Sequence, residues 1–219
     1  LSSSSAASDV YKRQLLFSIL FFGVLSGIVL QWHMSNNPFP KKQLEALSES
    51  TVLFDRNGRP LSRSLTLEEQ WRLPVSLRDI SPWLKKATIA VEDERFMKHP
   101  GVDFISVSRA CIQNLFAGGV VSGASTLDMQ LCRMLDPRPR TLEAKLSEAA
   151  RAWQADVCLS KDEILEAYLN LAPYGGNLQG AEAASLKYFG KSASELSLPE
   201  AALLAVSYTH LTLPTKRIV

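Results

Sequence analysis

The stretch SPWLKKATIAVEDERF, residues 81–96, decides the fold class, because its apolar residues recur at the spacing of one face of an α-helix. Ser81 is a favourable N-cap, and Pro82 stands at the first helical position, where a missing N–H is tolerated. We expect this helix to continue to residues 99–101, a helix-ending His-Pro-Gly. The apolar face is formed by Ile80, Leu84, Ala87 and Val91.

Further helical patterns with their own start and stop signals follow along the chain. Starts are expected at Asp103, Ser125, Thr141, Ser160 and Ser197, and stops at Gly118, Pro137, Pro173 and Gly190. Two of the starts, at 160 and 197, have the Ser-x-x-Glu spacing of a capping box. Strands and helices do not alternate, so we predict a mostly α domain over 81–206 and exclude a Rossmann-type sheet.

The residues before this domain, 35–80, are expected to form a linker that contains a small β hairpin. The segment TVLFDRNGRPL, residues 51–61, reads as two short strands on either side of an Asn57-Gly58 turn.

A membrane anchor is predicted over residues 15–34. The run LLFSILFFGVLSGIVL, residues 15–30, has no charge and would span ~24 Å as a helix, or ~30 Å with its apolar extension. A cleavable signal peptide is the alternative, but the residues that follow offer no small-x-small cleavage site. Lys12 and Arg13 would keep the N-terminus in the cytoplasm and place the rest of the chain outside.

Both ends of the chain read as foreign sequence. Residues 1–14 and 207–219 resemble translated adapter sequence, so we expect both to be non-native flanks. On this interpretation Lys12 and Arg13 are not native, and the helical domain is truncated after Val206, in the middle of its last helical pattern.

Composition excludes several classes of protein. The chain has 219 residues, of which 46% are hydrophobic, so one packed domain is expected rather than a disordered chain. Its 24 basic and 22 acidic residues leave a net charge of +2, which gives no reason to expect nucleic-acid binding. The three widely spaced cysteines exclude a disulfide scaffold and a zinc ribbon, and we expect them to be buried apolar residues. They are Cys111, Cys132 and Cys158.

An acidic triplet at residues 92–94 is the first candidate for chemistry. Such a triplet on a helix is usually a solvated face. Here it stands just before a helix-ending His-Pro-Gly, where a loop could border a cleft, so Glu92 is a candidate general base.

A second candidate is the segment GASTLDMQ, residues 123–130, which has the form of a loop that leads into a helix. Thr126, Gln130 and Arg133 would share one face of that helix, and free N–H groups at its start suit an anionic oxygen.

Lys145 and Glu148 form the third candidate, at i and i+3 on one helix face. They could be a surface ion pair worth less than ~1 kcal/mol. Alternatively, a second carboxylate beside a cation suits sugar transfer from a diphosphate donor rather than simple glycoside hydrolysis.

Taken together, the chain resembles the peptidoglycan glycosyltransferase domain (glycosyltransferase family 51) of class A penicillin-binding proteins, most like the 1C type, over residues 52–206. Five blocks stand in the order expected of that family: EDERF at 92–96 with His99 and Gly101, GASTLDMQL at 123–131, residues 140–148, KDEILEAYLN at 161–170, and YGG at 174–176 with Gly180.

The resemblance implies a lysozyme-like helical fold that polymerises lipid II into β-1,4 glycan strands and releases undecaprenyl diphosphate. Glu92 would be the general base and Glu148 the second catalytic carboxylate. Lys145 would stabilise the leaving diphosphate. The remaining substrate-binding residues implied by the resemblance are Asp93, Ser125, Thr126, Gln130, Arg133, Tyr168 and Asn170, of which Tyr168 and Asn170 would support the site rather than react.

Three positions depart from the family pattern. Ala144 stands where most relatives have an arginine, Asp128 where Thr or Ser is usual, and Met134 where Asn is common. We expect Asp128 to point away from Thr126 on the helix and Ala144 to weaken contact with the diphosphate. Both glutamates are present, so the domain is expected to be active.

The resemblance also implies partners and a location. The partners are lipid II, the nascent glycan strand, the bilayer and other cell-wall synthesis proteins. The location is the bacterial plasma membrane, crossed once, with the catalytic domain outside. No cofactor motif is visible, although a Mg or Mn ion at the donor diphosphate is implied by the family. Transpeptidase motifs are absent from this sequence.

Two alternatives remain open at this point. A lysozyme-like peptidoglycan hydrolase or lytic enzyme would share the fold and a lone glutamate, and a non-catalytic envelope scaffold would keep the fold alone. Apolar residues after the first block are expected either to touch lipid or to be ordinary core; they are Phe104, Ile105, Val107, Leu115 and Phe116.

Overall fold

The computed structural model describes residues 13–14, 17–18, 20–21, 23–25, 27–28, 31–32, 34–56, 60–119, 121–139 and 141–210. Contacts divide the chain into two units, Leu1–Pro38 and Phe39–Val219. Most of the two predicted flanks and part of the predicted anchor, including residues 15–16 and 29–30, lie outside the described residues. Within the described ranges, no helix combines the length and apolarity that a bilayer crossing requires.

The second unit is mostly helical, as predicted. Its helices are α2 (Lys41–Glu45), α3 (Pro82–Glu92), α4 (Phe104–Ala117), α5 (Leu127–Leu135), α6 (Leu142–Cys158), α7 (Lys161–Leu171), α8 (Ala181–Tyr188) and α9 (Leu198–His210). In the described part of this unit, three short 3₁₀ helices lie at Leu77–Asp79, Phe96–Lys98 and Ala193–Glu195.

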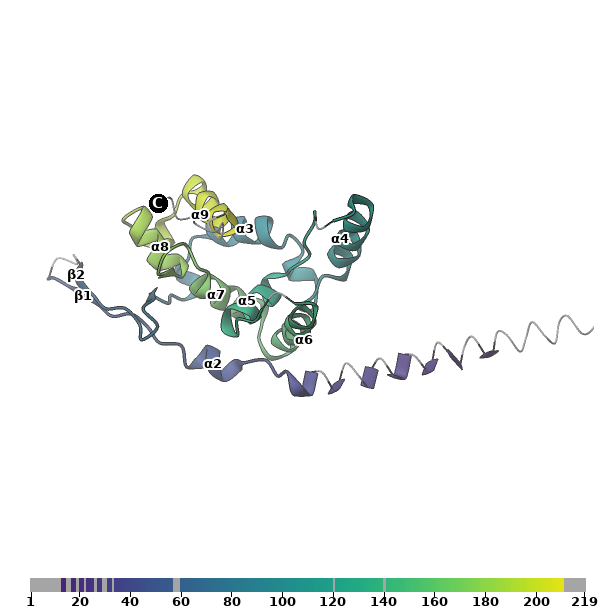
Figure 1. The fold of residues 1–219 in the computed structure, drawn as a ribbon. Helices are drawn as coiled ribbons and strands as arrows, with labels where there is room; N and C mark the ends of the chain where they lie inside the picture. Colours follow the sequence, from purple (N-terminus) through teal and green to yellow (C-terminus); the bar gives the residue numbers. More distant parts are fainter. Residues whose placement is uncertain are drawn as a thin grey trace, which may run out of the picture. The chain divides into compact units, whose positions relative to one another are not determined.

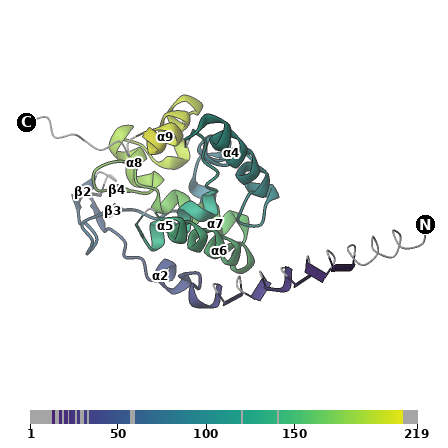
Figure 2. The same ribbon diagram turned by 45° about the vertical axis from the view of Figure 1, so that its right-hand side comes forward.

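Helices α5 and α7 lie in the middle of this unit (Figures 1 and 2). Helix α5 packs on α6 and α7, and α3 packs on α9. The main core is made of leucines, alanines and aromatic residues from these helices, among them the fully buried Leu84, Leu127 and Leu169. Burial of such side chains supplies most of the stabilisation, because each contributes ~2 kcal/mol on transfer from water.

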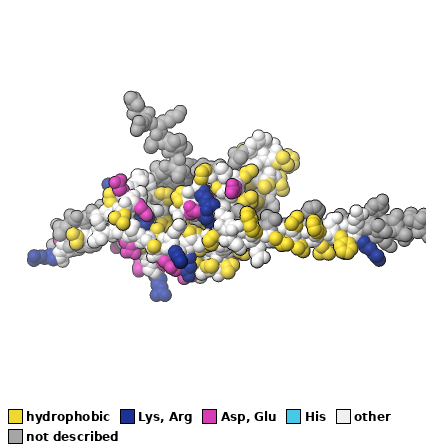
Figure 3. Space-filling model, turned by 60° about the horizontal axis from the view of Figure 1, so that its bottom comes forward, with side chains coloured by type: hydrophobic (Ala, Val, Ile, Leu, Met, Phe, Trp, Pro, Cys, Tyr) yellow, Lys and Arg dark blue, Asp and Glu magenta, His cyan; other side chains and the backbone are white. Residues whose placement is uncertain are grey.

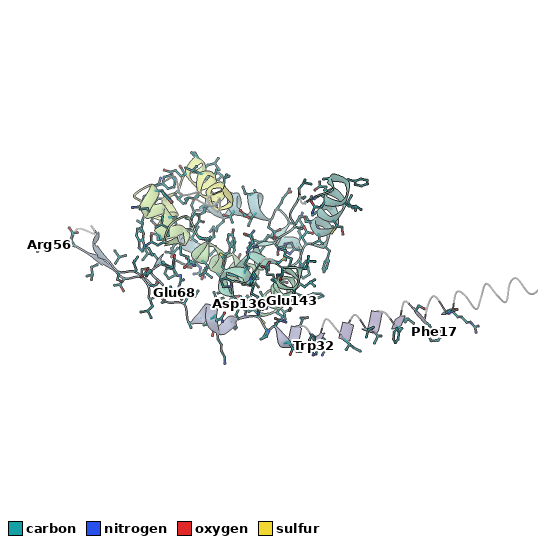
Figure 4. All side chains as sticks on the ribbon, viewed as in Figure 1. Phe17, Trp32, Arg56, Glu68, Asp136 and Glu143 are labelled. Atoms are coloured by element: carbon teal, nitrogen blue, oxygen red, sulfur yellow. The ribbon has the colours of Figure 1, made fainter. Side chains whose placement is uncertain are left out.

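Among the described residues, the β structure is limited to two small sheets. Strands β1 (Val52–Phe54) and β2 (Pro60–Arg63) pair antiparallel, which confirms the predicted hairpin, although residues 57–59 lie outside the described ranges. Figure 4 labels Arg56 at the outer end of this hairpin. Strands β3 (Trp71–Arg72) and β4 (Leu178–Gln179) pair in parallel and join the segment before α3 to the segment before α8.

Residues before α3 pack on the helices. Phe39 is buried in a second apolar cluster with Val102 and Met129. Its backbone N–H donates to Oε1 of Gln154 in α6 at 2.9 Å. The packed unit therefore includes residues that the sequence assigned to a linker.

Most predicted helix starts are confirmed by their caps. Ser81, Asp103 and Thr141 each accept a hydrogen bond from the backbone of the first helical turn, and Ser160 forms the predicted capping box with Glu163. The start predicted at 125 falls one residue later, since Thr126 is the N-cap of α5.

The end of helix α8 agrees with the stop predicted at Gly190, but its start was not predicted from the sequence. Its N-cap is Gly180, which has no side chain to cap the helix and therefore leaves no sequence signal.

The first helix ends earlier than predicted, at Glu92 rather than at residues 99–101. Asp93 leaves the helical conformation with φ −160° and ψ 76°. Its carboxylate accepts from the Leu127 backbone N–H and from Nε2 of His99, at 3.1 and 2.9 Å. These contacts compete with helix continuation and end α3 at the glutamate.

The expectation of three buried cysteines is wrong for two of them. Cys132 is buried in the second apolar cluster, whereas Cys111 and Cys158 are exposed. On the face drawn in Figure 3, acidic and basic side chains are intermingled, in keeping with the balanced charge of the sequence.

Asp128 is fully buried in α5 and pairs with Lys161 of α7, whose Nζ lies 3.2 Å from Oδ1. The same ammonium contacts Asp156 at 2.6 Å and lies over the Phe96 ring. Burial raises the pKa of Asp128 to about 6, and the attraction of Lys161 offsets part of that rise. This departure from the family pattern therefore forms an internal ion pair, and the side chain points away from the Thr126 cap, as expected.

Gly101 is required where the turn after α3 crosses α6. Its φ is +78°, and a Cβ there would lie 2.3 Å from the carbonyl oxygen of Ala152. We predict that Gly101→Ala lowers the free energy of unfolding by ~3 kcal/mol, through steric overlap and left-handed strain. Urea denaturation measures this. Gly118→Ala is the matched control, because φ is +67° there but the space is open, and it should cost only about 1 kcal/mol. An equal loss of unfolding free energy in the two variants would contradict the close approach of Gly101 to Ala152.

Because the pKa of Asp128 is raised in the folded state, this group stabilises the fold most at low pH, and that contribution is lost as pH rises through about 6. The free energy of unfolding of Asp128→Asn, measured relative to that of the parent, should therefore rise by ~2–3 kcal/mol from about pH 4 to about pH 8. Denaturation at both pH values tests this. Asp162→Asn, which alters an exposed carboxylate of α7, should track the parent. A constant difference between Asp128→Asn and the parent would refute the raised pKa.

Candidate active site

Glu92 is the last residue of α3, at the point where the chain turns toward the 3₁₀ helix at Phe96–Lys98. Its position is fixed by Asp93, whose contacts to Leu127 and His99 join the end of α3 to the start of α5. Glu92 is half-buried and does not belong to a solvated acidic face.

The two carboxylate oxygens of Glu92 have different surroundings. Oε2 accepts a hydrogen bond from Nε2 of Gln130 at 2.8 Å. Oε1 is buried and has no hydrogen-bond partner among the described residues. Burial raises the pKa of Glu92 and outweighs Gln130 and Arg133, which lower it, while Asp93 adds a smaller rise. A carboxylate with a raised pKa and a free oxygen is suited to accept a proton.

A polar pocket of about 280 Å³ lies beside Glu92. Its walls come from the end of α3, the start of α4 and the loop before α5. The lining residues are Ala90, Val91, Glu92, Asp93, Glu94, Arg95, Asp103, Ser106, Arg109, Gly123, Ala124, Ser125 and Thr126.

A second polar cluster joins the loop before α5 to α5 and α6. Lys145 Nζ lies 2.5 Å from Ser125 Oγ and 3.3 Å from Glu148 Oε2. Arg133 lies 4.0 Å from the same carboxylate oxygen of Glu148. Because Arg133 also lowers the pKa of Glu92, its guanidinium acts on both predicted catalytic glutamates. The pair at 145 and 148 is therefore part of a network.

Three predicted substrate-binding residues are engaged with the protein itself. Thr126 is buried, donates to the Gly101 carbonyl at 2.6 Å and caps α5. Asp93 is held by its two contacts described above. Tyr168 is 1% exposed, and its hydroxyl lies 3.5 Å from Oε1 of Gln130. The polar atoms of these side chains therefore hold the site together.

Asn170 is not brought together with the others. Both of its amide atoms bond to the backbone of Val75, at 3.0 and 2.9 Å. It lines a different pocket, of about 420 Å³, which also contains Lys41, Arg72 and Glu166.

The other departures from the family pattern also face inward. Ala144 is buried, and its N–H donates to Thr141 as part of the α6 cap. Met134 is partly buried against the main core. An added arginine at 144 would therefore start from a buried position rather than from the diphosphate side.

Among the residues that the structure describes, Asp93, His99 and Asp128 form a group whose ligand atoms lie within 4.8 Å of one another. The Lys161 ammonium already contacts Asp128, and Asp93 accepts from His99 and a backbone N–H. The group is therefore a charge-compensated hydrogen-bond cluster that links α3, α5 and α7.

Some pocket residues were not singled out from the sequence. Arg95 lies 3.2 Å from Asp103, and Arg109 donates to Ser106 at 3.1 Å, all on the pocket wall. The signal for Arg95 was its place directly after the acidic triplet. For Arg109, which lies in the middle of α4, no local signal existed.

Comparisons with known proteins agree with this geometry. Residues 57–214 match the model of the family described as transglycosylase. The chain is 48% identical to penicillin-binding protein 1C of Escherichia coli (strain K12) over 163 residues, 74% of this chain and 21% of the relative. It is 40% identical to penicillin-binding protein 2D of Bacillus subtilis (strain 168) over 158 residues, 72% of this chain and 23% of the relative. It is 39% identical to penicillin-binding protein 1A of Aquifex aeolicus (strain VF5) over 189 residues, 85% of this chain and 25% of the relative.

The chain thus spans about a fifth to a quarter of the length of these curated relatives. The match begins after α2 and β1 and covers every helix from α3 to α9, and with them both polar clusters. The chain belongs to the transglycosylase family, as a peptidoglycan glycosyltransferase domain of the class A penicillin-binding protein type, similar to the 1C type.

Proposed function

We propose that this chain polymerises lipid II into β-1,4 glycan strands with inversion at the anomeric carbon and release of undecaprenyl diphosphate. The observation that carries the proposal is the pairing of a half-buried glutamate, which has one free oxygen, with a separate cation cluster on α5 and α6. This arrangement offers a base at one point and charge stabilisation at another, as transfer from a diphosphate donor requires.

In the proposed reaction, the carboxylate of Glu92 takes the proton of the acceptor's 4-hydroxyl group. The hydroxyl oxygen forms a bond to the donor's anomeric carbon while the bond from that carbon to the diphosphate breaks. The raised pKa of Glu92 makes it a stronger base than an exposed glutamate.

The cation cluster would stabilise the departing diphosphate. Lys145 and Arg133 supply positive charge, and Ser125 offers a hydroxyl beside Lys145. Glu148, largely buried between the two cations, would hold them in place and so contribute to catalysis through their geometry.

A divalent cation at the diphosphate is implied by the family resemblance, but the side chains of this cluster do not fit a protein-held metal. Glu148 is the one carboxylate among the described residues of this cluster, and both of its cationic neighbours already engage it. Two cations and a hydroxyl suit an anion rather than a metal ion. We therefore derive no step through such an ion.

The alternatives from the sequence fit the site less well. A peptidoglycan hydrolase has no diphosphate to bind, so it would have no use for Lys145 and Arg133 beside Glu148. A non-catalytic scaffold gives no reason for a carboxylate with a raised pKa on the wall of a polar pocket.

The substrate's polyprenyl tail suggests where the domain works. We propose the outer side of the bacterial plasma membrane, with the bilayer, the glycan strand and cell-wall synthesis proteins as partners. Four of the five predicted lipid-facing residues are exposed on α4, with Leu115 at 80% and Phe116 at 87%, whereas Val107 is partly buried in the second apolar cluster. Together Phe104, Ile105, Leu115 and Phe116 form the α4 apolar patch.

The direct test is incubation of the full chain, in detergent, with labelled lipid II, followed by gel separation of the products. Polymers of increasing length would support the proposal. Cleavage of finished peptidoglycan without polymer would support the hydrolase, and no reaction with either substrate would support the scaffold.

Glu92→Gln should reduce polymerisation at least 10²-fold with little change in stability, because the amide keeps the shape but cannot accept the proton. In the parent, activity should fall on acidification at a pH above the ordinary glutamate value, since the pKa of Glu92 is raised and the charged form is the active one. Initial rates across pH measure both effects. A variant within threefold of the parent would exclude Glu92 as the base.

The unit Phe39–Val219, made without the preceding residues, should float with phosphatidylglycerol-containing liposomes through the α4 apolar patch. The double variant Leu115→Glu, Phe116→Glu should stay in solution. Leu67→Glu is the matched control, because this leucine is 98% exposed but lies outside α4. Failure of the unit to float while circular dichroism shows it folded would remove the patch as a lipid contact.

A further inference from the structure

We infer that Tyr168 and Gln130 form a positioning relay for Glu92, in which the tyrosine hydroxyl orients the glutamine amide and the amide fixes the glutamate carboxylate. This inference rests on the proposed function, because it assigns Glu92 the role of base. It differs from the role that the family resemblance implies for Gln130, which is donor binding.

The contacts form a chain from the core to the pocket. Tyr168 Oη lies 3.5 Å from Gln130 Oε1, and Gln130 Nε2 donates to Glu92 Oε2 at 2.8 Å. Tyr168 is 1% and Gln130 is 5% exposed. A side chain buried to that degree and bonded at both ends of its amide has little capacity left for a substrate.

The carboxylate and the tyrosine together set which way the amide faces. If the amide of Gln130 were reversed, its oxygen would face the carboxylate of Glu92, and its NH₂ group would face the hydroxyl. The ionised carboxylate can only accept, so it requires the NH₂ group, and the Tyr168 hydroxyl completes this orientation by donating to the amide oxygen.

The relay also fixes the orientation of the carboxylate. Because Oε2 accepts from Gln130, it is held in place, and Oε1 is left without a partner among the described residues. A hydrogen bond to the charged carboxylate favours that form, so loss of the amide should make Glu92 easier to protonate.

The experiment compares pH profiles of lipid II polymerisation for the full chain and two variants. Gln130→Met keeps the length of the side chain but removes the donor. We expect kcat to fall about 10- to 100-fold, KM to change less than threefold, and the acid limb of kcat/KM to move up by about one pH unit. Tyr168→Phe should move the acid limb in the same direction by a smaller amount.

Tyr188→Phe is the matched control. Its hydroxyl donates to the Tyr174 carbonyl at 2.7 Å, so the variant loses a comparable hydrogen bond away from Glu92. It should leave the acid limb unmoved, even where stability falls slightly.

A raised KM with unchanged kcat and an unmoved acid limb for Gln130→Met would overturn the relay and assign Gln130 to donor binding. If the parent itself does not polymerise lipid II, the proposed function fails. The relay is then read by ¹³C NMR titration of the glutamate carboxyls, in which Glu92→Gln identifies the signal. Gln130→Met must raise the midpoint of Glu92, and an unchanged midpoint would overturn the relay without reference to activity.

Discussion

The hydrogen bond from the Leu127 backbone N–H to the Asp93 carboxylate is the contact on which the site depends. It places a carboxylate from the end of α3 at the start of α5, where the helix dipole and free N–H groups favour negative charge. The same carboxylate accepts from His99, and Thr126 at the start of α5 donates to Gly101. These contacts fix the turn after α3 against α5 at both ends. Glu92 and Gln130 meet as a consequence.

Charge is distributed in the site according to burial. The most buried carboxylate, Asp128, has a lysine partner, while Glu148 lies between two cations that are themselves partly exposed. Glu92 is half-buried and has one neutral donor, so its pKa rises instead of being lowered by an ion pair. A direct salt bridge to Glu92 would keep the carboxylate charged but would weaken it as a base. The structure therefore separates a base from an anion-binding cluster within a small volume.

Local sequence signals predicted the helices because caps and apolar periodicity act over a few residues. Ser81, Asp103 and Ser160 are caps in the structure as they were in the sequence. Two errors, at the end of α3 and at the start of α8, arose where no local signal marks the helix boundary. Helix α3 ends early because Asp93 bonds to residues 6 and 34 positions away, and α8 starts at a glycine that offers no cap. Such contacts depend on the tertiary fold and cannot be derived from neighbouring residues.

The candidate site could be predicted as a set of residues but not as a set of roles. The motifs place Glu92, Gln130 and Thr126 near one another, yet only the structure distinguishes them by what their polar atoms already bond. The hydroxyl of Thr126 donates to the Gly101 carbonyl and caps α5. The amide of Gln130 bonds to Glu92 at one end and to Tyr168 at the other. Glu92 alone among these three retains a buried oxygen without a partner in the described part of the chain. Its burial raises the pKa of the same carboxylate, so the side chain whose oxygens the fold satisfies least is also the one best suited to accept a proton beside the polar pocket.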